Sequence, residues 1–137
     1  MRAYPQGSIW VVSIAPGEKI PDQLIEWICH RGWPAAAVWG IGAVRDPVLG
    51  YYDVARQTYV RYDLAGAWEL VACHGTLSTR EDTPVLHLHV VLSDREGHTR
   101  GGHLFDATIS AAGEFVVYPL PNAMRRQWNA QIGLHLL

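Results

Sequence analysis

The stretch "VLHLHVVL" at residues 85–92 alternates leucine and valine with histidine in the pattern of a β-strand. Side chains at positions i and i+2 of a strand lie on the same face of the sheet. His87 and His89 therefore share one face, with their Cβ atoms about 7 Å apart by strand geometry. The opposite face is aliphatic, is expected in the core, and consists of Leu86, Leu88, Val90 and Leu92.

Segments rich in β-branched and aromatic residues predict further strands on both sides of this one. Residues 21–32 predict a helix, because Pro21 suits a first helical turn and Gly32 suits a helix end. The tail 122–137 predicts a short helix followed by a strand. The other predicted strands cover 8–14, 35–44, 67–78, 103–110 and 114–120, with a hairpin at 50–64.

The order of these elements predicts the fold class. Strands are many, helices are one or two, and strict strand–helix–strand alternation is absent, which favours an α+β fold with a largely antiparallel sheet and flanking helices. A chain of 137 residues without a repeat or a linker fits one domain, which we place at 1–137.

Composition excludes several classes of partner. The formal net charge is −2, and no basic cluster exceeds the pair Arg125–Arg126, so no basic field attracts nucleic acid or anionic lipid. The first ten residues contain no apolar segment of a secretory signal, and no apolar run has the length of a membrane span. The two cysteines form no disulfide framework. We expect a cytoplasmic protein with no membrane partner.

A third histidine, His103, follows in "GGHL". Three histidines with one open position are typical of catalytic zinc sites, and other transition metals accept the same ligands. The alternative is a strand with a merely polar face. If 84–93 and 102–109 paired simply across their loop, His103 would lie about 10 Å along the strand from His89. Convergence would then require a kink at Gly101–Gly102 or a ligand from another subunit.

Two carboxylates are candidates to support such a site. Glu69 lies in a predicted strand, and an inward-facing Glu69 could orient a metal-bound imidazole or act as a general base. Asp106 is a weaker candidate for the same roles. A salt bridge with an arginine is the favoured alternative for both. His98 is expected on an exposed loop, and His74 is expected to be structural.

Two motifs resemble a known family. "GAWELVACHGTLS" at 66–78 and "LHLHVVLSDREGHTRGGHLFDATI" at 86–109 look like the signature of the plant and prokaryote conserved (PPC) domain, also called DUF296. The resemblance implies an antiparallel sheet with flanking helices, a homotrimer, and a metal site at His87, His89 and His103. Plant members carry an AT-hook that holds DNA while the PPC domain mediates protein association, and prokaryotic members are labelled as predicted DNA-binding proteins.

The chain contains no Arg-Gly-Arg-Pro core of an AT-hook, which disfavours direct DNA binding. We therefore expect a prokaryotic PPC protein without an AT-hook, forming a homotrimer with a transition metal, zinc foremost, at the three histidines. One alternative is a DNA-associated regulatory module that binds other proteins. Another is a metal-dependent hydrolase or lyase, for which Glu69 is the candidate catalytic residue.

Overall fold

The computed structural model describes residues 1–137. Seven strands form one antiparallel sheet in the order β1-β2-β7-β6-β5-β3-β4, and β8 and β9 form a separate hairpin. The antiparallel sheet predicted from the sequence is thus confirmed. The elements are β1 (Arg2–Gln6), β2 (Ile9–Ile14), α1 (Ile20–His30), β3 (Ala35–Asp53), β4 (Thr58–Asp63), β5 (Ala67–Arg80), β6 (Thr83–Ser93), β7 (Thr99–Leu120), β8 (Gln127–Asn129) and β9 (Leu134–Leu136).

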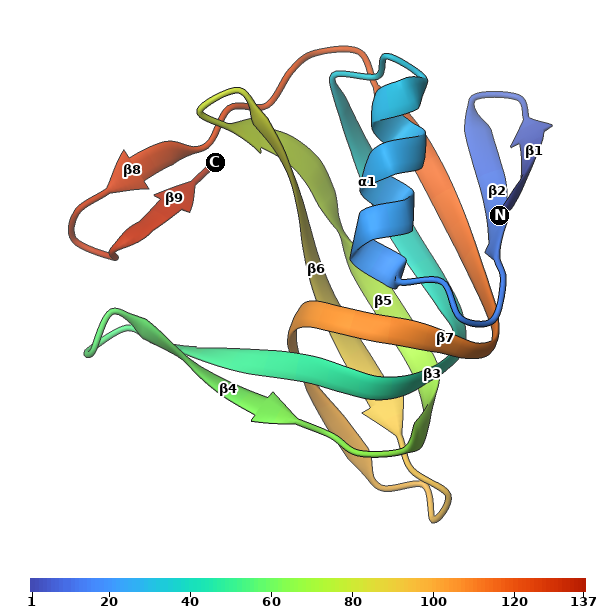
Figure 1. The fold of residues 1–137 in the computed structure, drawn as a ribbon. Helices are drawn as coiled ribbons and strands as arrows, with labels where there is room; N and C mark the ends of the chain where they lie inside the picture. Colours follow the sequence, from blue (N-terminus) through green and yellow to red (C-terminus); the bar gives the residue numbers. More distant parts are fainter.

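Two long, bent strands close the sheet on itself (Figure 1). β7 pairs with β2, β6 and β3, while β3 pairs with β4, β5 and β7, so β7, β6, β5 and β3 form a ring of paired strands. The sequence predicted separate segments, because bulges such as the one after Gly40 interrupt the alternation. Gly42 has φ +155°, and a Cβ atom there would lie 2.9 Å from the Gly113 Cα atom. Glycine thus permits the close approach of β3 and β7.

The core lies between the sheet and α1 (Figure 1). The aliphatic face predicted for β6 is buried there, with 8% or less of each side chain exposed. Leu24 and Ile28 of α1 are fully buried against it. The helix ends at His30, and Gly32 follows with φ +71°. No helix has the length and hydropathy needed to cross a membrane.

The tail differs from its prediction. Residues 127–136 form the β8–β9 hairpin and no helix, so α1 is the only helix beside the sheet. The Asn129 carboxamide oxygen accepts hydrogen bonds from the backbone N–H groups of Gln131 and Ile132, and Gly133 has φ +75°. Asparagine and glycine at these positions stabilise a turn, which outweighs the weak helical signal before them.

The hairpin is anchored at both ends to the main sheet. At its start, Thr79 of β5 exchanges backbone hydrogen bonds with Met124 and Arg126. At its tip, the Tyr52 hydroxyl donates to the Ile132 carbonyl oxygen over 2.5 Å. The C-terminal hairpin therefore spans from the end of β5 to the β3–β4 hairpin and encloses the space between them.

Candidate metal centre

The three histidines of the sequence prediction come together within one subunit. His89 on β6 lies directly opposite His103 on β7, and His87 is two residues away on the same face. The hairpin estimate from the sequence, which placed His103 about 10 Å along the strand from His89, is wrong because it assumed too long a loop. The loop covers only residues 94–98, and β7 begins at Thr99.

Asp94 explains the short turn. Its Oδ1 atom accepts hydrogen bonds from the backbone N–H groups of Glu96 and His98, and its own N–H donates to the His98 carbonyl oxygen. Ser93 consequently pairs with Thr99, and this register carries His103 to His89 four steps along the strand. A kink that swings His103 back is not needed.

The imidazole rings are close enough to share one ion. Ring centroids lie 5.0 Å apart for His87–His89, 5.1 Å for His87–His103 and 5.7 Å for His89–His103. One ligating nitrogen from each ring lies within 4.8 Å of the others. Tetrahedral zinc with bonds of about 2.0–2.1 Å holds its ligand atoms about 3.3 Å apart. Small ring rotations therefore suffice to close the site.

The surroundings keep two of these imidazoles neutral. Burial lowers the pKa of His87, with a further contribution from the Arg126 charge. Burial, reinforced by His87, His89 and Arg126, lowers the pKa of His103 to about 4. A neutral imidazole has the free lone pair that a metal requires. The Nδ1 atom of His103 is buried and has no hydrogen-bond partner, and a metal ion bound by it would satisfy this nitrogen. The residues thus fit a transition metal.

Close strand contacts hold the three histidines in place. A Cβ atom on Gly75 of β5 would overlap the His87 carbonyl oxygen, and one on Gly50 of β3 would overlap the Phe105 ring. The Phe105 ring packs against His103 with centroids 4.7 Å apart, and Tyr59 packs on the same imidazole at 5.1 Å. The glycines therefore allow backbone and aromatic rings to approach the site from both sides.

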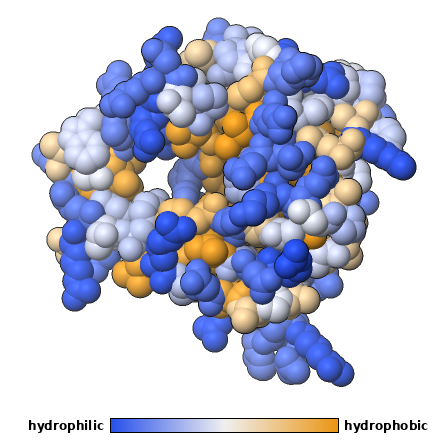
Figure 2. Space-filling model, in the orientation of Figure 1, coloured by the Kyte–Doolittle hydropathy of each residue, from blue (hydrophilic) through white to orange (hydrophobic).

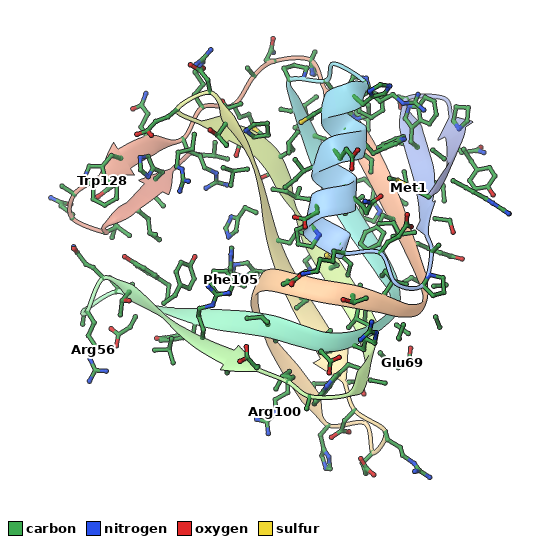
Figure 3. The ribbon with its side chains drawn as sticks, in the orientation of Figure 1. Met1, Arg56, Glu69, Arg100, Phe105 and Trp128 are labelled. Carbon is green, nitrogen blue, oxygen red and sulfur yellow. The ribbon has the colours of Figure 1, made fainter.

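His87 and His103 open into a cavity of about 480 Å³. One wall belongs to the sheet and includes Phe105, and the other belongs to the C-terminal hairpin and includes Trp128 (Figure 3). Figure 2 shows the molecule hollowed between this hairpin and the main body. Arg126 lines the cavity, and sequence reasoning missed its role because nothing local indicates that the tail folds back over β5.

The predicted supporting carboxylates lie elsewhere. Glu69 pairs with Ser93, four residues along β6 from His89, and its side chain is exposed and far from the cavity (Figure 3). Asp106 accepts a hydrogen bond from Lys19 Nζ over 2.5 Å, so the salt-bridge interpretation holds for it, with lysine in place of arginine. The structure brings neither carboxylate to the histidines.

The other histidines and the cysteine considered in the sequence lie outside the three-histidine cluster. His98 is bound to Asp94 within the β6–β7 turn and its side chain is 79% exposed. His74 lies opposite His89 but borders a different hollow, which it shares with Trp39. Cys73 is buried, and burial raises the pKa of its thiol to about 12, which excludes a thiolate nucleophile there.

The sequence matches the family model of the Plants and Prokaryotes Conserved (PCC) domain over residues 1–121. The chain belongs to this family. The resemblance noted in the sequence is thereby confirmed. Residues 122–137, which contain the C-terminal hairpin, lie outside the match. The search of curated proteins found no match.

Solved structures share the fold of this PPC protein. A protein from Archaeoglobus fulgidus described as metal-containing is 34% identical, with a TM-score of 0.87 over 95% of this chain and 92% of the other. A PPC protein from Pyrococcus horikoshii is 27% identical, with a TM-score of 0.87 over 95% and 90%. A candidate DNA-binding protein from Bacteroides thetaiotaomicron is 25% identical, with a TM-score of 0.94 over 98% and 94%.

Proposed function

We propose that this PPC protein binds one transition metal ion per chain, zinc foremost, through His87, His89 and His103. The observation that carries the proposal is the cluster of three imidazoles with ligating nitrogens within 4.8 Å, one of them buried without a partner. Three nitrogen ligands would leave a tetrahedral ion with one free coordination position, and two of the three histidines, His87 and His103, line the adjacent cavity. The similarity to the metal-containing protein from Archaeoglobus fulgidus supports the assignment.

We propose further that the protein assembles as a homotrimer. Its outer sheet face exposes large apolar side chains, with Trp39, Ile41 and Val71 44%, 56% and 51% exposed. They border one hollow of about 390 Å³ together with Val11 and Val116. Apolar surface gathered in this way is typical of a subunit contact. A second copy of the chain is the occupant implied by the family resemblance.

The test is elemental analysis of untagged protein purified without chelator. We expect about one metal ion per chain in the wild type and its loss in a His87→Ala/His89→Ala double variant that keeps its circular dichroism spectrum. The matched control is His30→Ala, which removes an exposed histidine in the last turn of α1, outside the cluster. Metal content that is unchanged in the first variant, or absent from the wild type after incubation with zinc, would contradict the proposal.

A second candidate is association with DNA through a protein partner. It rests on the similarity to the candidate DNA-binding protein from Bacteroides thetaiotaomicron. The net charge of −2 opposes direct binding, because phosphate neutralisation supplies most of the affinity for DNA. A duplex titration at physiological salt should therefore show no binding by the chain alone.

Localisation in the cytoplasm also stays a prediction.

A further inference from the structure

We propose that the cavity beside His87 and His103 binds a small organic carboxylate, whose carboxyl group pairs with Arg126. This inference rests on the proposed metal site and deepens it, because it names the class of molecule that would meet the open coordination position.

Arg126 is fixed in place without an acidic partner. Its Nε atom donates to Ser78 Oγ over 2.8 Å, and its Nη1 atom donates to the His135 carbonyl oxygen over 3.4 Å. Ser78 is fully buried, so the guanidinium is anchored from beneath. Two of the five N–H donors are used in this way, which leaves three without a protein acceptor.

The neighbouring Arg125 differs from Arg126 because it has an acidic partner. Arg125 Nη1 pairs with Asp82 over 2.9 Å on the surface, where its side chain is 70% exposed. Arg126 lines the cavity and takes part in no salt bridge. A partly buried guanidinium without a counterion is costly unless a ligand supplies the negative charge. Arg126 is therefore placed as an anion-binding group, while Arg125 is not.

The cavity as a whole favours an anion. Its charged lining consists of Arg80 and Arg126 and includes no aspartate or glutamate. The other polar groups are the imidazoles of His87, His103 and His135 and the Tyr59 hydroxyl. The nearest carboxylate contact is at the rim, where Glu81 lies 3.6 Å from His135 and is 82% exposed. A metal ion on the three histidines would add positive charge to the same space.

The walls favour an organic carboxylate over a phosphate. Phe105, Trp128 and Leu134 contribute an aromatic and aliphatic lining that suits a hydrocarbon body. The single helix α1 packs on the core and does not line the cavity, so no helix N-terminus provides a phosphate cradle. The planar guanidinium can bind both oxygens of one carboxylate. A volume of about 480 Å³ suits a small ligand.

Isothermal titration of zinc-loaded protein with phenylacetate tests the inference. We expect saturable binding to the wild type and binding weakened about 10-fold or more in Arg126→Met, because a charge-assisted hydrogen bond is lost. Arg125→Met is the matched control and should bind as the wild type does. Phenylacetamide, which has the same body without the charge, should bind more weakly than phenylacetate. A parallel titration with inorganic phosphate tests whether the cavity prefers a phosphate to a carboxylate.

The results of this titration and of elemental analysis distinguish failure of the carboxylate site from failure of the metal site. Zinc-loaded wild type that does not bind phenylacetate, or Arg126→Met that binds it equally well, would overturn the inference and leave the metal proposal intact. Tighter binding of phosphate with the same dependence on Arg126 would also overturn the carboxylate assignment. If elemental analysis finds no zinc, but phenylacetate binds and Arg126→Met weakens it, the metal proposal fails and the carboxylate site stands.

Arg126→Met removes a hydrogen bond from buried Ser78 and could unfold the hairpin. Arg126→Lys covers this case, because it keeps the positive charge but lacks the two-pronged guanidinium. We expect Arg126→Lys to bind phenylacetate more weakly than the wild type and with unchanged zinc content. Affinity equal to the wild type would refute the role assigned to the guanidinium.

Discussion

Replacing Gly75 by alanine should disable the metal site without touching any of its ligands. Gly75 of β5 pairs with Leu88 of β6, and a Cβ atom on it would overlap the His87 carbonyl oxygen and lie 2.7 Å from the His87 carbonyl carbon. Ordinary contact begins at 3.4 Å, so the His87 backbone must retreat by at least about 0.7 Å. His87 would then leave its position in the cluster.

Two magnitudes follow from this displacement. Overpacking a close-packed interior costs about 1–3 kcal/mol, and we expect the upper end because backbone has to move. Metal–ligand distances tolerate changes of about 0.2 Å. A larger shift of one ligand should therefore weaken zinc binding about 10- to 100-fold, as loss of a supporting contact does. Urea unfolding of the metal-free protein measures the first effect, and competition with a chromophoric chelator measures the second.

Gly7→Ala is the matched control. Gly7 has φ +65° in the β1–β2 turn, and a Cβ atom there meets nothing within 4 Å. The variant should lose about 1–2 kcal/mol through left-handed backbone strain and keep its zinc affinity. If Gly75→Ala retains both wild-type stability and wild-type zinc affinity, the close pairing of β5 and β6 behind His87 is refuted.

Three further predictions concern the metal, the pH and the assembly. Free zinc at 100 times its Kd should stabilise the native wild type by about 2.7 kcal/mol and raise its Tm. Zinc should not raise the Tm of His87→Ala/His89→Ala, and an equal increase in Tm for both proteins would contradict the site. Burial lowers the pKa of His103 from its ordinary value of 6.5 to about 4 in the fold, so the unfolded chain takes up a proton first as the pH falls. The stability of the metal-free protein should therefore decrease as the pH drops from 6.5 towards 4. His103→Gln should lose less stability over this range, and an equal loss would refute the assignment. The mass of the wild type measured by light scattering should be about three times the chain mass of 15.3 kDa. The Trp39→Asp/Val71→Asp variant should have the mass of a single chain, because charges in the apolar face would prevent the subunit contact. A monomeric wild type would refute the trimer.

The sequence predicted the features that depend on neighbouring residues. Alternation along β6 placed Leu88 in the core and His87 and His89 on one face, as the structure shows. The same local pattern, together with the His103 motif, indicated the family. These predictions were possible because strand periodicity is a property of consecutive residues and survives almost any tertiary arrangement.

Features that depend on distant partners could not be read in this way. The tail was predicted to begin as a helix, but its turn at Asn129 and its bonds to Thr79 and Tyr52 make it a hairpin over the cavity. Glu69 matched a supporting role by residue type alone, and the register of β5 with β6 places it away from the site.

Local sequence was therefore enough to predict most strands of the main sheet, the two faces of β6, the family and the three histidines, although it divided β3 and β7 into separate segments and missed β1 and β8. The three-dimensional fold was needed to show that His103 stands opposite His89 and that Arg126 lines the cavity beside His103. The physical reason is that a side chain's face follows from the residues beside it, whereas its partners follow from strand register and chain closure. Register here depends on a turn held by Asp94, and closure depends on contacts between segments far apart in the chain.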